Sequence, residues 1–209
     1  MQKNLAAVLE QAGVVPVLVI DEVKDALPLA QALVEGGLNV LEVTLRTEAA
    51  LGAVEEIAKH LPDAHVGTGT VLTADDVRRS VDAGATFMVS PGATEALIDA
   101  VEQSTVPMLP GAANPSEVMR LLERGFTYQK FFPAEAAGGV PMLKSIGGPL
   151  GQVKFCPTGG VSPGNAQEYL ALKNVVCVGG SWMAAPKLVA EKNWAEITRL
   201  AKEASALKG

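Results

Sequence analysis

The sequence predicts an α/β fold: a closed, parallel (β/α)8 TIM barrel in a single domain over residues 1–209, with an extra N-terminal helix. Two observations support this prediction. Short apolar runs rich in β-branched residues recur eight times, at intervals of roughly 20–27 residues, the length of one strand-plus-helix unit. Stretches with the apolar period of a helix separate these runs, and no Pro/Ser-rich linker divides the chain.

The eight apolar runs are expected to form the barrel strands. An open, doubly wound sheet is the competing architecture, but such a sheet usually needs fewer strands. In a barrel, functional side chains lie at the C-terminal ends of the strands. The predicted strands cover residues 14–20, 39–45, 65–71, 86–90, 106–109, 128–132, 153–156 and 175–178.

Helices are predicted between the strands from periodicity and from capping residues. Residues 25–35 and 48–60 have helical periods, and residues 5–11 form the extra helix, with Asn4 as its N-cap. Thr73 and the pair Ser162-Pro163 are expected to begin two further helices. The apolar face of residues 25–35 comprises Ala26, Leu29, Ala30 and Leu33. The glycines expected just past helix ends are Gly36, Gly37, Gly84 and Gly125.

Composition limits the partners of the chain. The net charge is −6 and no basic run occurs, which argues against a nucleic-acid partner. The apolar segment at residues 13–20 is interrupted by Pro16 and is too short to cross a bilayer, so we expect no membrane association. Cys156 and Cys177 suggest neither a metal site nor a disulfide scaffold. We therefore expect a soluble, cytoplasmic protein.

Lys130 is the most informative residue, because it stands in an apolar predicted strand and two phenylalanines and a proline follow it. An ammonium without a partner there is costly, unless its pKa falls until the proton is lost. A neutral lysine is a nucleophile that forms a Schiff base with ketones and aldehydes. The alternative is a lysine at a strand end whose amine reaches solvent.

The second predicted strand carries a polar face that points into the barrel. Because side chains alternate along a strand, Glu42, Thr44 and Arg46 share one face. Arg46 can bind a substrate carboxylate through two hydrogen bonds, and Glu42 can move protons beside Lys130. Alternatively, Glu42 and Arg46 pair with each other or with polar groups at the rim. The opposite, apolar face comprises Leu41, Val43 and Leu45.

Small and polar residues also come after other predicted strands. In a barrel, glycine-rich loops after the seventh and eighth strands often bind phosphate through backbone N–H groups, although turn conformation also favours glycine. Thr70 and Pro91 stand at the ends of the third and fourth strands, where Thr70 can donate a hydrogen bond. His60 and His65 form no cluster with acidic residues and no dinucleotide motif opens a helix, so we expect neither metal nor cofactor. The two glycine-rich segments contain Gly159 and Gly160, and Gly179, Gly180 and Ser181.

Taken together, five motifs make the chain resemble the class I aldolases of 2-keto-3-deoxy-6-phosphogluconate (KDPG), which often also act on 4-hydroxy-2-oxoglutarate (KHG). The motifs are highly specific and extend in consistent order over nearly the whole chain. They lie at residues 41–48, 67–72, 90–92, 130–135 and 155–160.

The resemblance implies a lyase of the Entner–Doudoroff pathway that yields pyruvate and glyceraldehyde 3-phosphate from a phosphorylated keto-sugar acid. It makes Lys130 the imine-forming residue and Glu42 the acid and base. It places Arg46, Thr70 and Thr158 around the carboxylate and carbonyl of pyruvate, and Pro91 and Phe132 against the reacting carbons. It assigns the phosphate to Gly159, Gly160, Gly179, Gly180 and Ser181. Family members are commonly homotrimers, so the resemblance also implies a homotrimer.

The chain departs from the family pattern at Ala113-Asn114, where a Ser-Thr pair is frequent. That loop is expected to face the sugar hydroxyls, so the preference between gluconate and galactonate epimers stays open, although residues 46–48 favour the gluconate branch. Two other functions are open. One is a phosphate-binding barrel isomerase or synthase, which needs no inward lysine. The other is a non-enzymatic sensor of a phosphorylated ligand.

Overall fold

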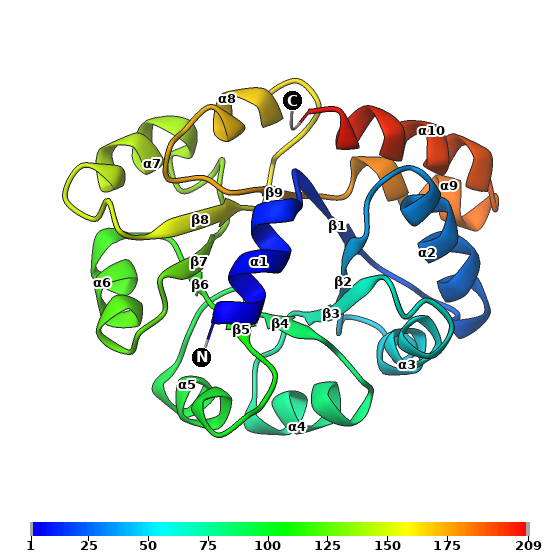
Figure 1. Cartoon of the computed structure of the whole chain (residues 1–209), viewed down its shortest axis with the longest axis horizontal. Helices are drawn as coiled ribbons and strands as arrows, with labels where there is room; N and C mark the ends of the chain where they lie inside the picture. Colours follow the sequence, from blue (N-terminus) through cyan, green and yellow to red (C-terminus); the bar gives the residue numbers. More distant parts are fainter. Residues whose placement is uncertain (1, 208–209) are drawn as a thin grey trace.

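Parallel strands form the centre of the computed structural model, which describes residues 2–207. Figure 1 shows these strands surrounded by helices, with the N-terminal helix α1 (Lys3–Gln11) crossing over the centre. The predicted α/β class with parallel strands and an extra N-terminal helix is confirmed. The strands are β1 Val14–Leu18, β2 Val40–Thr44, β3 His65–Gly69, β4 Phe87–Val89, β5 Met108–Leu109, β6 Gly111–Ala112, β7 Tyr128–Phe131, β8 Lys154–Pro157 and β9 Val178–Gly180.

The strands pair in two sheets, with the orders β5-β4-β3-β2-β1-β9 and β6-β7-β8. Consecutive strands are neighbours and β9 lies beside β1, so the order does not reverse about a central strand as it does in a doubly wound sheet. Two isolated parallel bridges connect the two sheets: Phe155 of β8 pairs with Val175, before β9, and Thr158, directly after β8, pairs with Gly179 of β9.

Two predicted strands need correction. The fifth, predicted over residues 106–109, is shortened to β5, which pairs with β4. Pro110, which has no N–H to donate to a ladder, separates β5 from the additional strand β6, which pairs with β7. The eighth begins at Val178 rather than at Val175, because the N–H of Val175 donates to the carbonyl of Leu172 in the turn after α8 (Ala166–Leu170). The other strands agree with the prediction to within two residues at each end.

The helices between the strands match most of the predicted capping signals. Thr73 and Asp76 form a capping box at the start of α4 (Ala74–Asp82). Gly37, Gly84 and Gly125 adopt left-handed φ angles of 90°, 81° and 85° just past helix ends. The predicted apolar face of α2 (Ala26–Glu35) is buried. The remaining helices are α3 Ala50–His60, α5 Glu95–Glu102, α6 Pro115–Glu123, α7 Gly139–Gly147, α9 Pro186–Ala190 and α10 Trp194–Ser205, with the 3-10 turns η1 Val23–Asp25 and η2 Trp182–Ala184.

Two predicted helix starts are wrong. Helix α1 spans Lys3–Gln11, so Asn4 lies inside it and Gln2 takes the N-cap position. The amide of Gln2 bonds instead to the backbone of Met108 and Tyr128, which fixes the helix against the ends of two strands. Helix α8 begins at Ala166 and not at Ser162-Pro163, because the side chain of Asn165 accepts a hydrogen bond from the N–H of Ser162 and holds a turn there.

Two apolar clusters lie on opposite faces of the strands. Leu41 and Val43 of β2 belong to the cluster between strands and helices, while Val40 belongs to an inner cluster that includes Leu5 and Leu9 of α1. Helix α1 therefore covers the N-terminal ends of the strands with apolar side chains. It does not cover the polar face of β2, which lies nearer the C-terminal ends. No helix within residues 2–207 combines the length and apolarity needed to cross a bilayer.

The hydroxyl of Tyr128 donates a hydrogen bond to Glu10 of α1, and this bond, with partial burial, raises the pKa of Tyr128 to about 12. A folded-state pKa above the unfolded value of about 10 stabilises the fold fully below about pH 10, and this contribution is lost as the pH rises toward about 12. We expect the free energy of unfolding, measured in urea, to fall more steeply in that window for the native chain than for Tyr128→Phe. Parallel pH profiles would contradict this assignment.

Candidate active site

One pocket, with a volume of about 230 Å³, contains all the residues predicted to act in catalysis or in binding the oxo-acid end of a substrate. These are Glu42, Arg46, Thr70, Pro91, Lys130, Phe132 and Thr158, and Val17 and Thr44 complete the lining. Each of these lining residues lies in a strand or within two residues after the end of one. Because the strands are parallel, their C-terminal ends bring these side chains together.

Lys130 and Glu42 form a buried contact at the base of this pocket. Nζ of Lys130 lies 3.3 Å from Oε1 of Glu42, and the two side chains are only 7% and 4% exposed. The amine also lies 5.2 Å from the ring centroid of Phe132. The amine therefore does not reach solvent, and Glu42 pairs with Lys130 rather than with Arg46. The Lys130 amine thus has a partner from another strand, as the inward face of β2 led us to expect.

Glycines at the strand ends provide the space for these polar groups. A Cβ on Gly69 would lie 2.2 Å from Oε1 of Glu42, and a Cβ on Gly179 would lie 2.3 Å from Oγ1 of Thr158. Distances under 3 Å are incompatible with ordinary packing. Gly69 and Gly179 are thus required sterically by the carboxylate and the hydroxyl that line the pocket.

Arg46 is held by Thr44, a pocket residue to which the sequence assigned no role. Nε of Arg46 donates to Oγ1 of Thr44 over 3.1 Å, and this hydroxyl donates to the carbonyl of Leu18 over 2.8 Å. Among residues 2–207, no carboxylate pairs with Arg46. Its remaining N–H groups are therefore free to bind an anionic ligand. The alternation of β2 already placed Thr44 beside Arg46, whereas no pattern in the sequence singled out Val17.

Thr70 has an unusual backbone conformation at the rim of the pocket. Its φ angle is 61°, in the left-handed region that a β-branched residue rarely adopts. Such a conformation costs about 1–3 kcal/mol and occurs preferentially at functional sites. The strain coincides with a residue that the sequence had assigned to substrate binding.

The five residues predicted to bind phosphate lie beside the pocket rather than in its lining. Gly159 and Gly160 come after β8 with φ angles of 99° and 81°, as expected for a loop. Gly179 and Gly180 belong to β9 itself, which corrects the expectation that they come after the strand. Gly180 is also packed against the indole of Trp182, where a Cβ would lie 1.9 Å from the ring. The bridge from Thr158 to Gly179 brings the two segments together, and the exposed Ser181 lies directly before η2.

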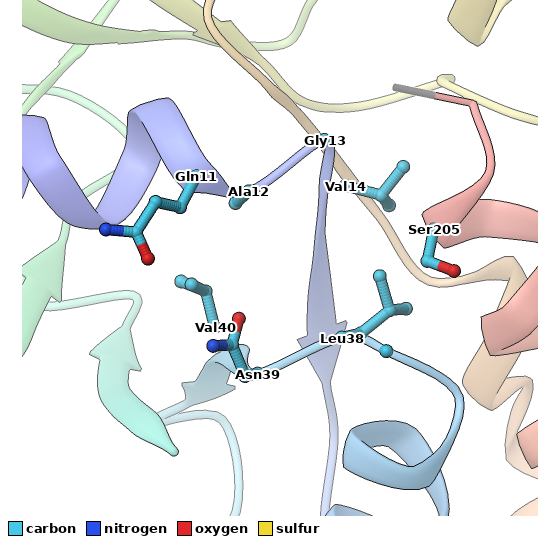
Figure 2. Close-up of a pocket in the computed structure, with 9 residues that line it drawn as sticks. Gln11, Ala12, Gly13, Val14, Leu38, Asn39, Val40 and Ser205 are labelled. Atoms are coloured by element: carbon cyan, nitrogen blue, oxygen red, sulfur yellow. The ribbon is translucent and has the colours of Figure 1, made fainter. Parts of the chain in front are cut away.

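A second pocket lies at the opposite ends of the strands and is less suited to chemistry. Figure 2 shows it beside the C-terminus of α1 and the starts of β1 and β2, with a volume of about 120 Å³. Its lining contains no titratable side chain. In the part of the chain that the structure describes, no group of three or more His, Cys, Asp or Glu side chains is arranged to hold a metal ion.

Comparisons with known proteins agree on one family. The family model described as KDPG and KHG aldolase matches residues 5–200. The 2-dehydro-3-deoxy-phosphogluconate aldolase of Pseudoalteromonas atlantica is 53% identical over 199 residues, which cover 95% of this chain and 93% of that protein.

Two solved structures are similar over nearly the whole chain. KDPG aldolase from Legionella pneumophila, with pyruvate captured at low pH as a covalent carbinolamine intermediate, has a TM-score of 0.96 at 49% identity, covering 98% of this chain and 100% of that one. The aldolase of Zymomonas mobilis ZM4 with 3-phosphoglycerate has a TM-score of 0.93 at 49% identity, covering 100% and 98%.

Replacement of Gly69 by alanine tests the steric role of this glycine. We expect Gly69→Ala to reduce the free energy of unfolding by about 1–3 kcal/mol, typical of overpacking, and to move the Glu42 carboxylate away from Lys130. Urea denaturation and a crystal structure of the variant measure the two effects. Gly92→Ala is the matched control, because a Cβ there meets no atom within 4 Å. Equal stability of both variants would contradict the steric role.

Proposed function

Because the chain belongs to the KDPG and KHG aldolase family, we propose that it is a class I aldolase. Its reaction is the reversible cleavage of 2-dehydro-3-deoxy-6-phosphogluconate to pyruvate and glyceraldehyde 3-phosphate. The observation that carries the proposal is the buried contact between Lys130 and Glu42, in a pocket that also contains an unpaired arginine. A buried amine with an adjacent carboxylate and an anion-binding group is what imine chemistry on a 2-oxo acid requires.

The proposal includes a closed (β/α)8 barrel that forms one domain over residues 1–209. Closure is supported at both seams between the two sheets. Residues 108–112 pair with β4 through β5 and with β7 through β6, so one continuous segment belongs to both sheets. At the other seam, the bridge from Thr158 to Gly179 joins β8 to β9. Residues 1, 208 and 209 of the proposed domain lie outside the described residues.

In the first step, the neutral amine of Lys130 attacks the carbonyl carbon C2 of the substrate. The proton of the ammonium passes to the Glu42 carboxylate, 3.3 Å away, before the attack. The new C–N bond gives a carbinolamine, and loss of its hydroxyl as water gives an iminium ion. Glu42 donates the proton that this leaving hydroxyl needs. The burial of both side chains favours the step, because bulk water competes with neither proton transfer.

In the second step, the iminium accepts the electron pair of the C3–C4 bond. The Glu42 carboxylate removes the proton from the C4 hydroxyl, the bond breaks, and glyceraldehyde 3-phosphate leaves. General-base assistance of this kind contributes typically about 10²–10⁴-fold to the rate. The remaining enamine takes a proton at C3, and hydrolysis of the imine releases pyruvate and restores the Lys130 amine.

Substrate binding is assigned to the other lining residues and to the glycine-rich segments. Arg46 binds the carboxylate of the oxo acid, Thr70 and Thr158 bind carboxylate and carbonyl oxygens, and Pro91 and Phe132 pack against the reacting carbons. The phosphate is assigned to Gly159, Gly160, Gly179, Gly180 and Ser181. The relative captured with a pyruvate carbinolamine and the relative bound to 3-phosphoglycerate support an oxo-acid end and a phosphate end.

Three finer features belong to the same proposal. The chain also cleaves KHG to pyruvate and glyoxylate, since the assigned pyruvate-binding residues do not involve the phosphate loops. It acts as a homotrimer in the cytoplasm. The family description, which includes KHG aldolases, supports the first feature. An isomerase or synthase that shares the late glycine loops is the second candidate, but it needs no buried lysine.

The imine is tested by trapping it on Lys130. We expect borohydride to inactivate the native chain only when pyruvate is present, with the adduct on the peptide that contains Lys130. Lys130→Ala should lose turnover and labelling together, because no other lysine lines the pocket. Mass spectrometry of the digested protein identifies the modified residue. An adduct on another lysine, or no adduct, would exclude the mechanism.

The carboxylate assignment is tested at Arg46. We expect Arg46→Ala to weaken pyruvate binding by about tenfold or more, because charged hydrogen bonds contribute about 1.5–3 kcal/mol. Arg46→Lys should recover only part of the affinity, since an ammonium lacks the two-pronged geometry of guanidinium. The concentration of pyruvate that gives half-maximal labelling measures the affinity. Unchanged affinity in Arg46→Ala would contradict the assignment.

A further inference from the structure

The loop after β8 presents a row of unused backbone donors. In the part of the chain that the structure describes, the N–H groups of Gly159, Gly160 and Val161 have no hydrogen-bond acceptor. Three unpaired amides in succession form a cradle that binds an anion well only if their directions are fixed. The groups that fix them lie on the opposite side of the same peptide units.

Each of the three peptide groups is anchored through its carbonyl. The carbonyl of Thr158 accepts from the N–H of Ala134 over 2.8 Å, and that of Gly159 accepts from the N–H of Glu135 over 3.0 Å. The carbonyl of Gly160 accepts from Nδ2 of Asn165 over 3.1 Å. In a trans peptide the N–H points away from the carbonyl of the same unit. Anchoring the three carbonyls therefore sets the directions of the three free N–H groups.

Asn165 holds the last of these peptides from two sides. Its Nδ2 donates to the carbonyl of Gly160, and its Oδ1 accepts from the N–H of Ser162 over 2.8 Å. One side-chain amide thus spans residues 160–162. The helix start predicted at Ser162 is displaced to Ala166 by this same arrangement.

Besides Asn165, a second group supports the peptide at Gly160, and we call these two supports braces. The hydroxyl of Tyr169, a residue with no exposed surface, donates a hydrogen bond to Oε1 of Glu135. The Glu135 side chain packs so closely that a Cβ on Gly160 would lie 2.5 Å from its Cγ. Burial, and then the hydrogen bond to Glu135, raises the pKa of Tyr169, so the hydroxyl remains a donor at neutral pH.

We propose that Asn165 and the Tyr169–Glu135 pair are positioning residues, which orient the amides of Gly159, Gly160 and Val161 for the phosphate of the substrate. This inference rests on the proposed function. The two braces touch neither Lys130 nor Glu42, so they govern selection of a phosphorylated substrate and not the imine chemistry. Loss of either brace leaves the amides in place but lets their directions vary.

The test compares a phosphorylated with a phosphate-free reaction in the same variants. We expect Asn165→Ala and Tyr169→Phe to reduce kcat/KM for KDPG cleavage by about three- to tenfold, the range for one lost hydrogen bond. Exchange of the pyruvate methyl protons with D2O uses the same lysine without a phosphate, and its rate should change by less than about twofold. Inorganic phosphate serves as a competitive inhibitor, and its inhibition constant should rise by the same factor by which kcat/KM for KDPG falls.

Two control variants separate positioning from loss of stability. Tyr128→Phe removes the hydroxyl of another tyrosine–glutamate pair, at the α1 end of the strands. Asn193→Ala removes the capping acceptor for the N–H of Glu196 at the start of α10. Both should leave the ratio of KDPG cleavage to pyruvate exchange unchanged, even if the free energy of unfolding falls.

An unchanged ratio in Asn165→Ala and Tyr169→Phe, or an equal loss in both reactions, overturns the inference. If Asn165→Ala does not fold, the isosteric Tyr169→Phe and the smaller change Asn165→Ser decide the question by the same ratio. Pyruvate-dependent borohydride labelling of the native chain distinguishes failure of this inference from failure of the proposed function. Labelled native protein with an unchanged ratio rejects only the positioning residues, whereas unlabelled native protein rejects the proposed function.

Discussion

The buried contact between Lys130 and Glu42 is the interaction on which the rest of the site depends. Removing two charged groups from water is costly, and such a pair persists only with a close partner and well-matched surroundings. The fold meets this requirement with groups from several strands. Gly69 leaves space for the carboxylate, and the ring of Phe132 faces the amine. Neither strand can supply the pair alone, so the contact depends on how the two sheets that contain β2 and β7 are arranged.

The two ends of the strands differ in polarity: apolar packing lies at the N-terminal ends, and the candidate site lies at the C-terminal ends. Helix α1 covers the N-terminal ends with Leu5 and Leu9 and fixes itself through Gln2 and Tyr128. The C-terminal ends carry the polar side chains, the strained Thr70 and the unpaired amides after β8. An apolar end therefore supports an end that carries the polar side chains and the unpaired backbone amides.

Features that depend on periodicity could be predicted from the sequence. Alternation along β2 placed Glu42 and Arg46 on one inward face, and the parallel repeat placed Lys130 and Thr158 at the same end. Features set by contacts between distant segments could not be predicted. Asn165 binds back to Ser162 and displaces a helix start, Pro110 separates β5 from the unpredicted strand β6, and Gly180 is required by the indole of Trp182. The sequence also left open whether Glu42 pairs with Lys130 or with Arg46, because this depends on how β2 and β7 are placed relative to each other.

The amine of Lys130, relieved of its proton by Glu42, is proposed to bond to the carbonyl carbon of a 2-oxo acid. A crystal structure of the native chain soaked with pyruvate tests this central claim most directly. We expect continuous electron density from Nζ of Lys130 to C2 of pyruvate, with the carboxylate at Arg46. Pyruvate bound without a covalent link, with the Lys130–Glu42 contact intact at neutral pH, would contradict the claim.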